Sequence, residues 1–164
     1  MKPFRVARGR DVVARLDPAE AQIVGLLLDQ LEQLLDADDV RDDAVLQRLF
    51  PDGHRGDAGI AADYRDLTEE SLRAGKADDL ATVRATLPPD GGEVRLDTDQ
   101  AAAWLRSTND IRLALGVRLD VTEDTEPPED PAGEEGQQLA VYYWLTAVQG
   151  SLVDALAAGR GARR

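Results

Sequence analysis

Apolar residues recur at helical spacing through most of the chain. The clearest stripe follows Asp17, a good N-cap acceptor that precedes a proline at the first helical position. It predicts a helix over about 18–37 and consists of Ile23, Val24, Leu27, Leu28, Leu31, Leu34 and Leu35. Less extensive stripes predict helices near 42–50 and 61–87, the second with a possible break near Gly75.

Two further stripes lie in the second half of the chain. Asp97 and Gln100 form a capping-box pattern that opens a predicted helix over about 97–116, with Gly116 as a natural stop. Its buried face should contain Ala101, Trp104, Leu105, Thr108, Ile111 and Leu115. The last stripe predicts a helix over 134–158, which we expect to be central, with Val141, Leu145, Val148, Leu152 and Leu156 on one face.

Extended segments are short and few. Apolar residues at 4–6 and 12–16 flank the turn-like residues 7–11 and predict an N-terminal β-hairpin. Residues 93–96 are a candidate strand. Residues 15–17 and 95–97 both read Arg-Leu-Asp before a helix, which coincident capping chemistry or a duplication would equally produce. The expected fold class is therefore mainly α, with an N-terminal β-hairpin packed on a helical bundle.

The length of 164 residues fits one domain. We expect a single domain over 1–164. Within it, the acidic, proline-rich residues of about 122–133 should form a flexible loop, and residues of about 159–164 a disordered tail.

Charge restricts the possible partners. The net charge is −13, from 32 acidic and 19 basic residues, and a surface of that sign repels phosphates. Contact with DNA is therefore expected to be indirect or weak, with Arg160, Arg163 and Arg164 as its basic cluster. The N-terminus lacks an apolar signal segment and no apolar run is long enough for a membrane span, so we expect a cytoplasmic protein without a membrane partner.

The sequence offers little catalytic chemistry. It has no cysteine, and its one histidine, His54, lies in a glycine-rich stretch where Asp52 and Asp57 are the nearest additional ligands. We interpret that stretch as a solvent-exposed loop, because metal sites need three or four converging ligands on a firm scaffold. No phosphate-binding loop, dinucleotide fingerprint or nucleophile elbow is present. We predict no catalytic residues, no cofactor, no metal site and no enzymatic activity.

One polar cluster stands out in the segment 104–120. It comprises Arg106, Asn109, Asp110, Arg112 and Arg118. Arg106 and Asp110 are spaced i,i+4, and Asn109 and Arg112 are spaced i,i+3, so each pair can meet on one helix surface. The cluster is either a salt-bridged structural face or a polar docking surface for a partner. The aromatic residues Tyr142–Trp144 similarly suit either core packing or an interface.

Two motifs carry a family resemblance. Residues 109–120 read Asn-Asp-x-Arg-Leu-x-Leu-Gly-x-Arg-Leu-Asp, and residues 143–153 contain Tyr-Trp-Leu and Gln-x-Ser-Leu-Val. With the hairpin, the Asp-Tyr-Arg of 63–65 and the acidic segment between the motifs, this order resembles the actinobacterial family of the oxidative-stress transcriptional regulator AosR, formerly a domain-of-unknown-function family. The resemblance implies a non-enzymatic regulator of transcription that acts through a protein partner such as an extracytoplasmic-function sigma factor.

The resemblance also implies a difference in mechanism. Redox sensing in that family is attributed to a Cys-x-x-x-Cys pair, and this sequence has no cysteine. We therefore expect regulation without the cysteine switch. The alternative is a protein-interaction or protease-adaptor-type module unrelated to transcription.

Overall fold

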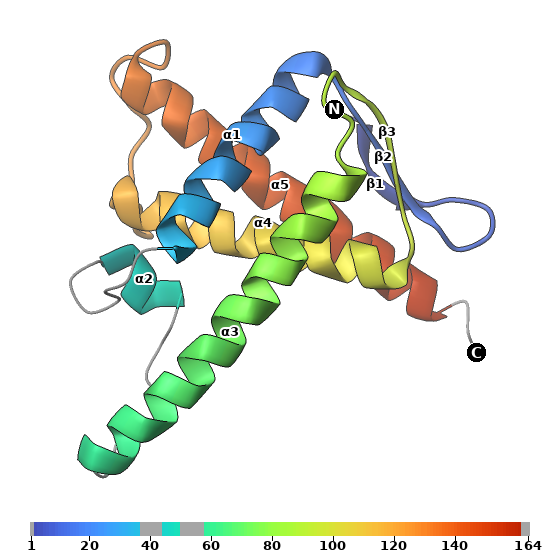
Figure 1. Ribbon diagram of the computed structural model, residues 1–164. Coiled ribbons are helices and arrows are strands. Elements are labelled where there is room, and N and C mark those ends of the chain that lie inside the picture. Colours follow the sequence, from blue (N-terminus) through green and yellow to red (C-terminus); the bar gives the residue numbers. More distant parts are fainter. Residues whose placement is uncertain (1, 37–43, 50–57, 162–164) are drawn as a thin grey trace.

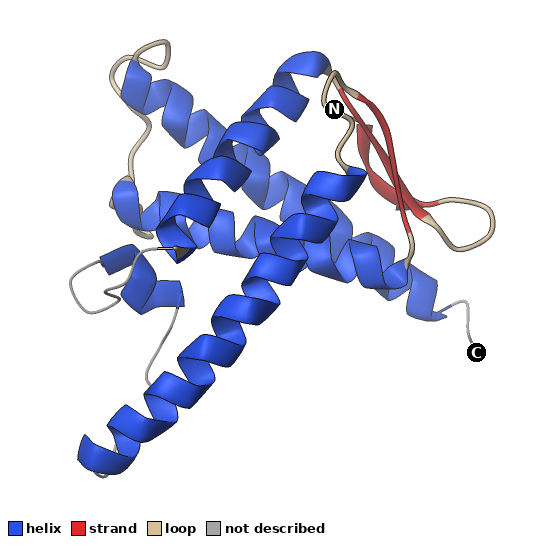
Figure 2. Cartoon of the chain, viewed as in Figure 1, coloured by secondary structure: helices blue, strands red, loops and turns tan. Residues whose placement is uncertain are grey.

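The computed structural model describes residues 2–36, 44–49 and 58–161. Its elements, in chain order, are β1 (Lys2–Val6), β2 (Val12–Leu16), α1 (Pro18–Leu35), α2 (Ala44–Leu49), α3 (Ala58–Thr86), β3 (Gly92–Leu96), α4 (Thr98–Arg118) and α5 (Glu134–Gly161). Helices dominate the cartoon, with the small sheet at one end and the N-terminal end of α3 extending away from it (Figures 1 and 2). The expected fold class is confirmed.

The predicted hairpin is one part of a three-stranded sheet. β1 pairs antiparallel with β2, and β2 pairs antiparallel with β3, so the strand order is β1-β2-β3. The turn between β1 and β2 is closed by bonds between Ala7 and both Arg10 and Asp11. It needs positive φ at Gly9 (89°) and Arg10 (75°). The candidate strand 93–96 is confirmed as β3, beginning one residue earlier.

The two Arg-Leu-Asp segments occupy equivalent places in the fold. Asp17 caps α1 with Glu20, Asp97 caps α4 with Gln100, and both are complete capping boxes. The strands before these caps, β2 and β3, pair with each other about the central pair Ala14 and Val94. The two strand–cap segments are therefore arranged antiparallel about that pair.

The core lies where the helices meet one face of the sheet. Trp104 of α4 is 2% exposed, packs edge-on against Phe4 of β1 at 5.6 Å, and donates from Nε1 to Thr86 Oγ1 at 2.7 Å. One indole thus joins β1, α3 and α4. α4 contacts all four other helices, whereas α5 contacts mainly α4 and β1. The central helix is α4, and our expectation that the last helix is central was wrong.

Two glycines do not interrupt or end their helices as the sequence suggested. α3 runs through Gly75 without a break, since one helical glycine costs only about 1 kcal/mol against alanine. α4 passes through Gly116 and ends at Arg118. The end is a Schellman motif, in which Val121 N–H bonds Gly116 O and Asp120 takes the left-handed position at φ 53°. The stop is therefore Asp120.

The remaining expectations concern loops and the C-terminus. Residues 122–133 contain neither helix nor strand, and turns within them are closed by Thr122, Thr125 and Asp130. α5 continues to Gly161, so the expected tail of about 159–164 is helical in its first three residues. His54 lies outside the described residues. No helix in the described ranges is both long and apolar enough to cross a membrane.

Gly91 offers a test of how the sheet is held against α1. A Cβ at Gly91 would lie 2.8 Å from the backbone of Asp17 and Pro18, and its φ is 83°. Gly91→Ala should therefore lower the free energy of unfolding by more than about 1 kcal/mol. Gly75→Ala is the matched control. A Cβ there meets nothing within 4 Å, so this change should stabilise the chain by about 0.5–1 kcal/mol. Chemical denaturation measures both, and equal effects would contradict the described approach.

Candidate functional site: the polar face of α4

The predicted polar cluster lies on the most crowded helix of the protein. Among the described residues, the buried polar side chains are Ser107, Thr108 and Asp110, and all three belong to α4. A buried polar group must find a hydrogen-bond partner or destabilise the fold by about 1–3 kcal/mol. The partners of this cluster therefore show what the cluster does.

Two charged members of the cluster, Arg106 and Asp110, bond to α3 and not to each other. Lys76 Nζ donates to both carboxylate oxygens of Asp110 at 2.9 Å. Arg106 donates through Nε and Nη2 to the two oxygens of Asp79, at 2.8 and 2.9 Å. The i,i+4 spacing allows Arg106 and Asp110 to meet within the helix, but each bonds instead across the α3–α4 contact.

These two ion pairs fix the register of α3 on α4. Lys76 precedes Asp79 on α3, while Arg106 precedes Asp110 on α4, so the charges match only when the helices run antiparallel. Sliding one helix by a turn would bring Lys76 towards Arg106 or Asp79 towards Asp110. Each of those pairs has like charges. The arrangement acts as charge pairs do in coiled coils, where they select one alignment over its neighbours.

Asn109 and Arg112 form a second seam, between α4 and α5. Gln149 Nε2 donates to Asn109 Oδ1 at 3.2 Å, and Arg112 Nε donates to Thr146 Oγ1 at 2.9 Å. A Cβ on Gly116 would lie 3.1 Å from Tyr142 Cε2. The three contacts advance along α4 as they retreat along α5, at spacings of three and four residues. This pattern is that of two antiparallel helices in close contact.

Arg112 and Gly116 of α4 both lie against Tyr142 of α5. The Arg112 guanidinium carbon lies 5.2 Å from the centroid of the Tyr142 ring, so a cation–π contact adds to its bond with Thr146. The i,i+3 spacing allows Asn109 and Arg112 to meet, but both bond instead to residues of α5. Arg118, the last member of the cluster, is exposed. The structure thus brings four of the five residues into contacts between helices.

The second motif extends these contacts to the sheet. Ser151 Oγ accepts from Phe4 N–H of β1 at 3.3 Å and donates to Val148 O at 2.9 Å. Leu152 beside it is fully buried. α5 therefore satisfies a backbone donor on the outer edge of β1 while Gln149 bonds to α4. The sequence reading did not single out Ser151 as a contact, because its partner is 147 residues away.

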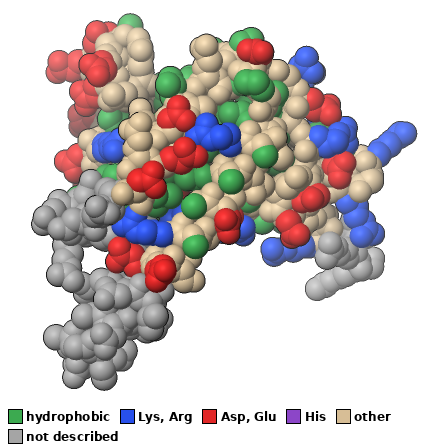
Figure 3. Space-filling model, in the orientation of Figure 1, with side chains coloured by type: hydrophobic (Ala, Val, Ile, Leu, Met, Phe, Trp, Pro, Cys, Tyr) green, Lys and Arg blue, Asp and Glu red, His purple; other side chains and the backbone are tan. Residues whose placement is uncertain are grey.

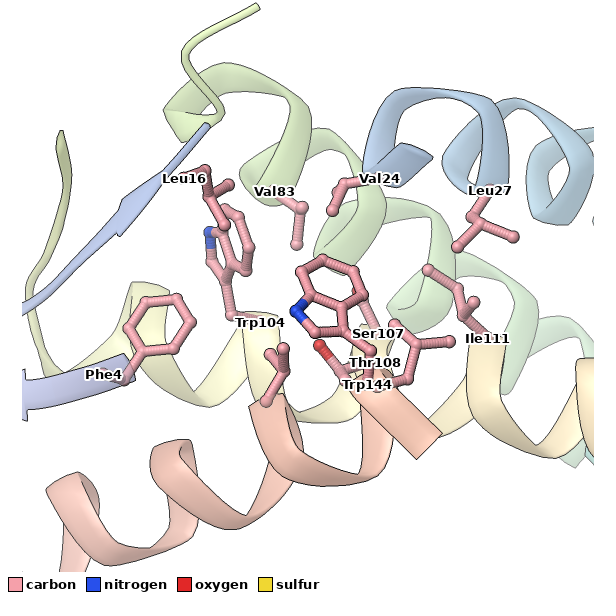
Figure 4. A pocket seen from close by; sticks show the side chains of 12 residues that line it. Phe4, Leu16, Val24, Leu27, Val83, Trp104, Ser107, Thr108, Ile111 and Trp144 are labelled. Carbon is pink, nitrogen blue, oxygen red and sulfur yellow. The ribbon is translucent and has the colours of Figure 1, made fainter. Parts of the chain in front are cut away.

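An interior cavity lies beside this seam but is too small for a metabolite (Figure 4). The cavity has a volume of about 20 Å³ for the centre of a water-sized molecule. Its walls are mainly apolar side chains such as Val83, Trp104 and Trp144. Ser107 Oγ, which is buried on the wall, has no hydrogen-bond partner within the described structure. The space is about that of one water molecule. No group of three or more His, Asp or Glu side chains in the described part could hold a metal ion.

Burial gives Asp110 an altered acidity. Burial raises the pKa of Asp110 above its ordinary value, the bonds from Lys76 oppose this, and the charge of Asp79 reinforces it. Desolvation of the carboxylate therefore outweighs its attraction to Lys76. Removing one member of such a pair leaves the other charge buried without its partner, which destabilises the fold.

Together the contacts define a small helical protein in which the polar residues hold helices in register around a closed core. The chain belongs to the family described as a domain of unknown function (DUF2017), whose sequence model matches residues 1–156. Among similar curated proteins is the oxidative stress regulator AosR of Mycobacterium tuberculosis strain H37Rv, 32% identical over 133 residues. A protein of the AosR designation from Mycobacterium leprae is 34% identical over 131 residues.

The similarity covers unequal shares of the two chains. The aligned region is 72% of this chain but 60% of the M. tuberculosis protein, and 71% against 60% for M. leprae. This chain therefore matches less than two thirds of the length of these relatives. No solved structure matches it significantly.

The ion pairs predict that a substitution lowers stability more where the substituted side chain is more deeply buried. Asp110 and Lys76 side chains are only 10% and 16% exposed, so Asp110→Ala should lower the free energy of unfolding by about 2 kcal/mol and the Tm by several degrees. Asp110→Asn should cost less, because it keeps the shape and one acceptor oxygen. Arg106→Ala is the control at the other α3–α4 pair. Arg106 is 59% exposed, so the loss should stay below about 1 kcal/mol. Denaturant titration would contradict this account if Asp110→Ala left stability unchanged.

The raised pKa of Asp110 determines in which direction the stability of the protein changes with pH. Its folded-state pKa lies above its unfolded-state pKa, so its favourable contribution is present below the unfolded value and lost as the pH rises through the folded value. The wild-type chain should therefore gain stability relative to Asp110→Asn as the pH falls from about 7 towards 4. Comparing the two at both pH values cancels the titration of the other acids. A relative loss of wild-type stability on acidification would be the opposite result.

Proposed function

We propose that this protein regulates transcription through a protein partner, a sigma factor of the extracytoplasmic-function class, without a cysteine switch within these 164 residues. The observation that carries the proposal is its similarity, over most of its length, to proteins named oxidative stress regulators. The absence of cysteine from the sequence means that no disulfide can form within it. A different signal, or a constant interaction, must then replace thiol oxidation in this chain.

The polar cluster of α4 serves this function as a structural element. Asn109, Asp110 and Arg112 each bond to α3 or α5, which supports a structural role for the cluster. Acidic side chains elsewhere give the chain its charge of −13 and suit contact with a basic protein surface. A regulator of this kind needs a firm scaffold more than a reactive site.

Binding to purified sigma factors tests the proposal. The tagged chain should retain one extracytoplasmic-function sigma factor from the same genome when each is offered separately. The chain's own mass and elution volume should be unchanged by modest hydrogen peroxide, because it contains no thiol. Retention of none of these sigma factors, with capture of a protease component instead, would favour the protease-adaptor alternative and contradict the proposal.

One variant separates scaffold from interface in the same assay. Arg118→Ala removes the exposed member of the cluster and should change neither the Tm nor sigma-factor retention. Arg118→Ala with normal melting but lost retention would instead place the interface on this edge of α4.

A further inference from the structure

The outer face of the sheet carries charge of the opposite sign to the rest of the protein. Residues 2–16 contain five basic residues and one acid, Asp11, although the net charge of the chain is −13. The basic residues are Lys2, Arg5, Arg8, Arg10 and Arg15, and all are exposed. The sequence expectation that the basic cluster lies in the C-terminal tail overlooked this group. We refer to these five residues as the hairpin basic group.

Strand register places three of the group on one surface. Lys2 pairs with Arg15, and Arg5 pairs with Val13, so these four residues share a face of the sheet. Val13 lies outside the core cluster that contains the alternate residues Val12 and Ala14. The shared face is therefore the one turned away from the helices. Arg8 and Arg10 extend the group to the hairpin turn.

The group outnumbers the two acids near it, Asp11 and Glu93, of which Glu93 lies opposite Arg15. Within the described structure, none of its five side chains has an ion pair or hydrogen bond. Arg95 on the same face already binds both nearby acids, Asp11 and Glu93. By contrast, Arg84 and Arg106 on the helices each bind carboxylates. Basic side chains project from the edge of the molecule where the hairpin lies (Figure 3).

We propose that the hairpin basic group contacts the phosphate backbone of duplex DNA. The face has a dense positive charge but no exposed apolar anchor, since its Val13 is only 3% exposed. Stable protein interfaces need a buried apolar or aromatic centre, whereas phosphate contacts need only exposed cations. With no aromatic side chain on the face to stack on a base, binding is independent of sequence. The acidic remainder of the protein keeps it weak.

Salt dependence of binding measures the number of phosphates contacted. The wild-type chain should bind a fluorescein-labelled duplex of about 20 base pairs of arbitrary sequence at low salt, with affinity falling as salt rises. The triple variant Arg5→Gln, Arg8→Gln, Arg15→Gln should reduce the slope of log affinity against log salt by about 2.7. Its affinity at low salt should fall at least about tenfold.

A second triple variant controls for net charge. Arg48→Gln, Arg84→Gln and Arg118→Gln removes the same three charges from exposed helix positions and should leave the slope unchanged. Equal losses in both variants, or no binding by the wild type at low salt, would overturn the proposal. Melting curves confirm that all three proteins are folded.

An acidic peptide serves as the competing probe. Residues 122–131 of this chain, made as a peptide, carry five acidic side chains. The duplex should bind more tightly than the peptide at equal ionic strength. Tighter peptide binding that the hairpin variant abolishes would assign the face to an acidic protein segment and overturn the DNA proposal. The inference uses charge alone, so its failure would leave the sigma-factor proposal standing.

Discussion

The ion pair between Lys76 and Asp110 constrains how the rest of this protein is assembled. α4 touches every other helix, so its alignment with α3 sets where its other faces point. With Asp110 bonded to α3, Asn109 and Arg112 face α5, and Trp104 reaches the sheet at Phe4. A shift of one turn would bring like charges together on α3 and separate the contacts with α5. Two weak effects, charge matching and close packing at Gly116, thus select one arrangement.

The same constraint explains what the polar residues of α4 do in a family without an assigned chemistry. Their partners lie on neighbouring helices, and the interior cavity beside them has room for one water molecule. The acidic side chains and the basic sheet face are charged surfaces that are exposed to other molecules.

Local chemistry made much of this fold predictable from sequence. The capping boxes at Asp17 and Asp97 involve residues three apart, so both helix starts were visible in the chain. The hairpin was predictable for the same reason. The partners of Arg106 and Asp110 were not, because spacing within one helix suggested a local pair while the actual partners lie 27 and 34 residues away. A usable signal did exist in the charge order, because a basic residue precedes an acidic one in both Lys76–Asp79 and Arg106–Asp110, and that order matches opposite charges between antiparallel helices. The end of α4 was predicted wrongly at Gly116, because glycine is typical both of helix ends and of close helix packing. Only the position of Tyr142 distinguishes the two roles.

A double-mutant cycle on Lys76 and Asp110 tests the central claim most directly. Lys76→Met, Asp110→Leu and the double variant would be compared with the wild type by denaturant unfolding. The account predicts a coupling free energy of about 1–3 kcal/mol, with the double variant more stable than the sum of the single losses implies. A coupling energy near zero would show that the pair does not determine how α3 lies on α4.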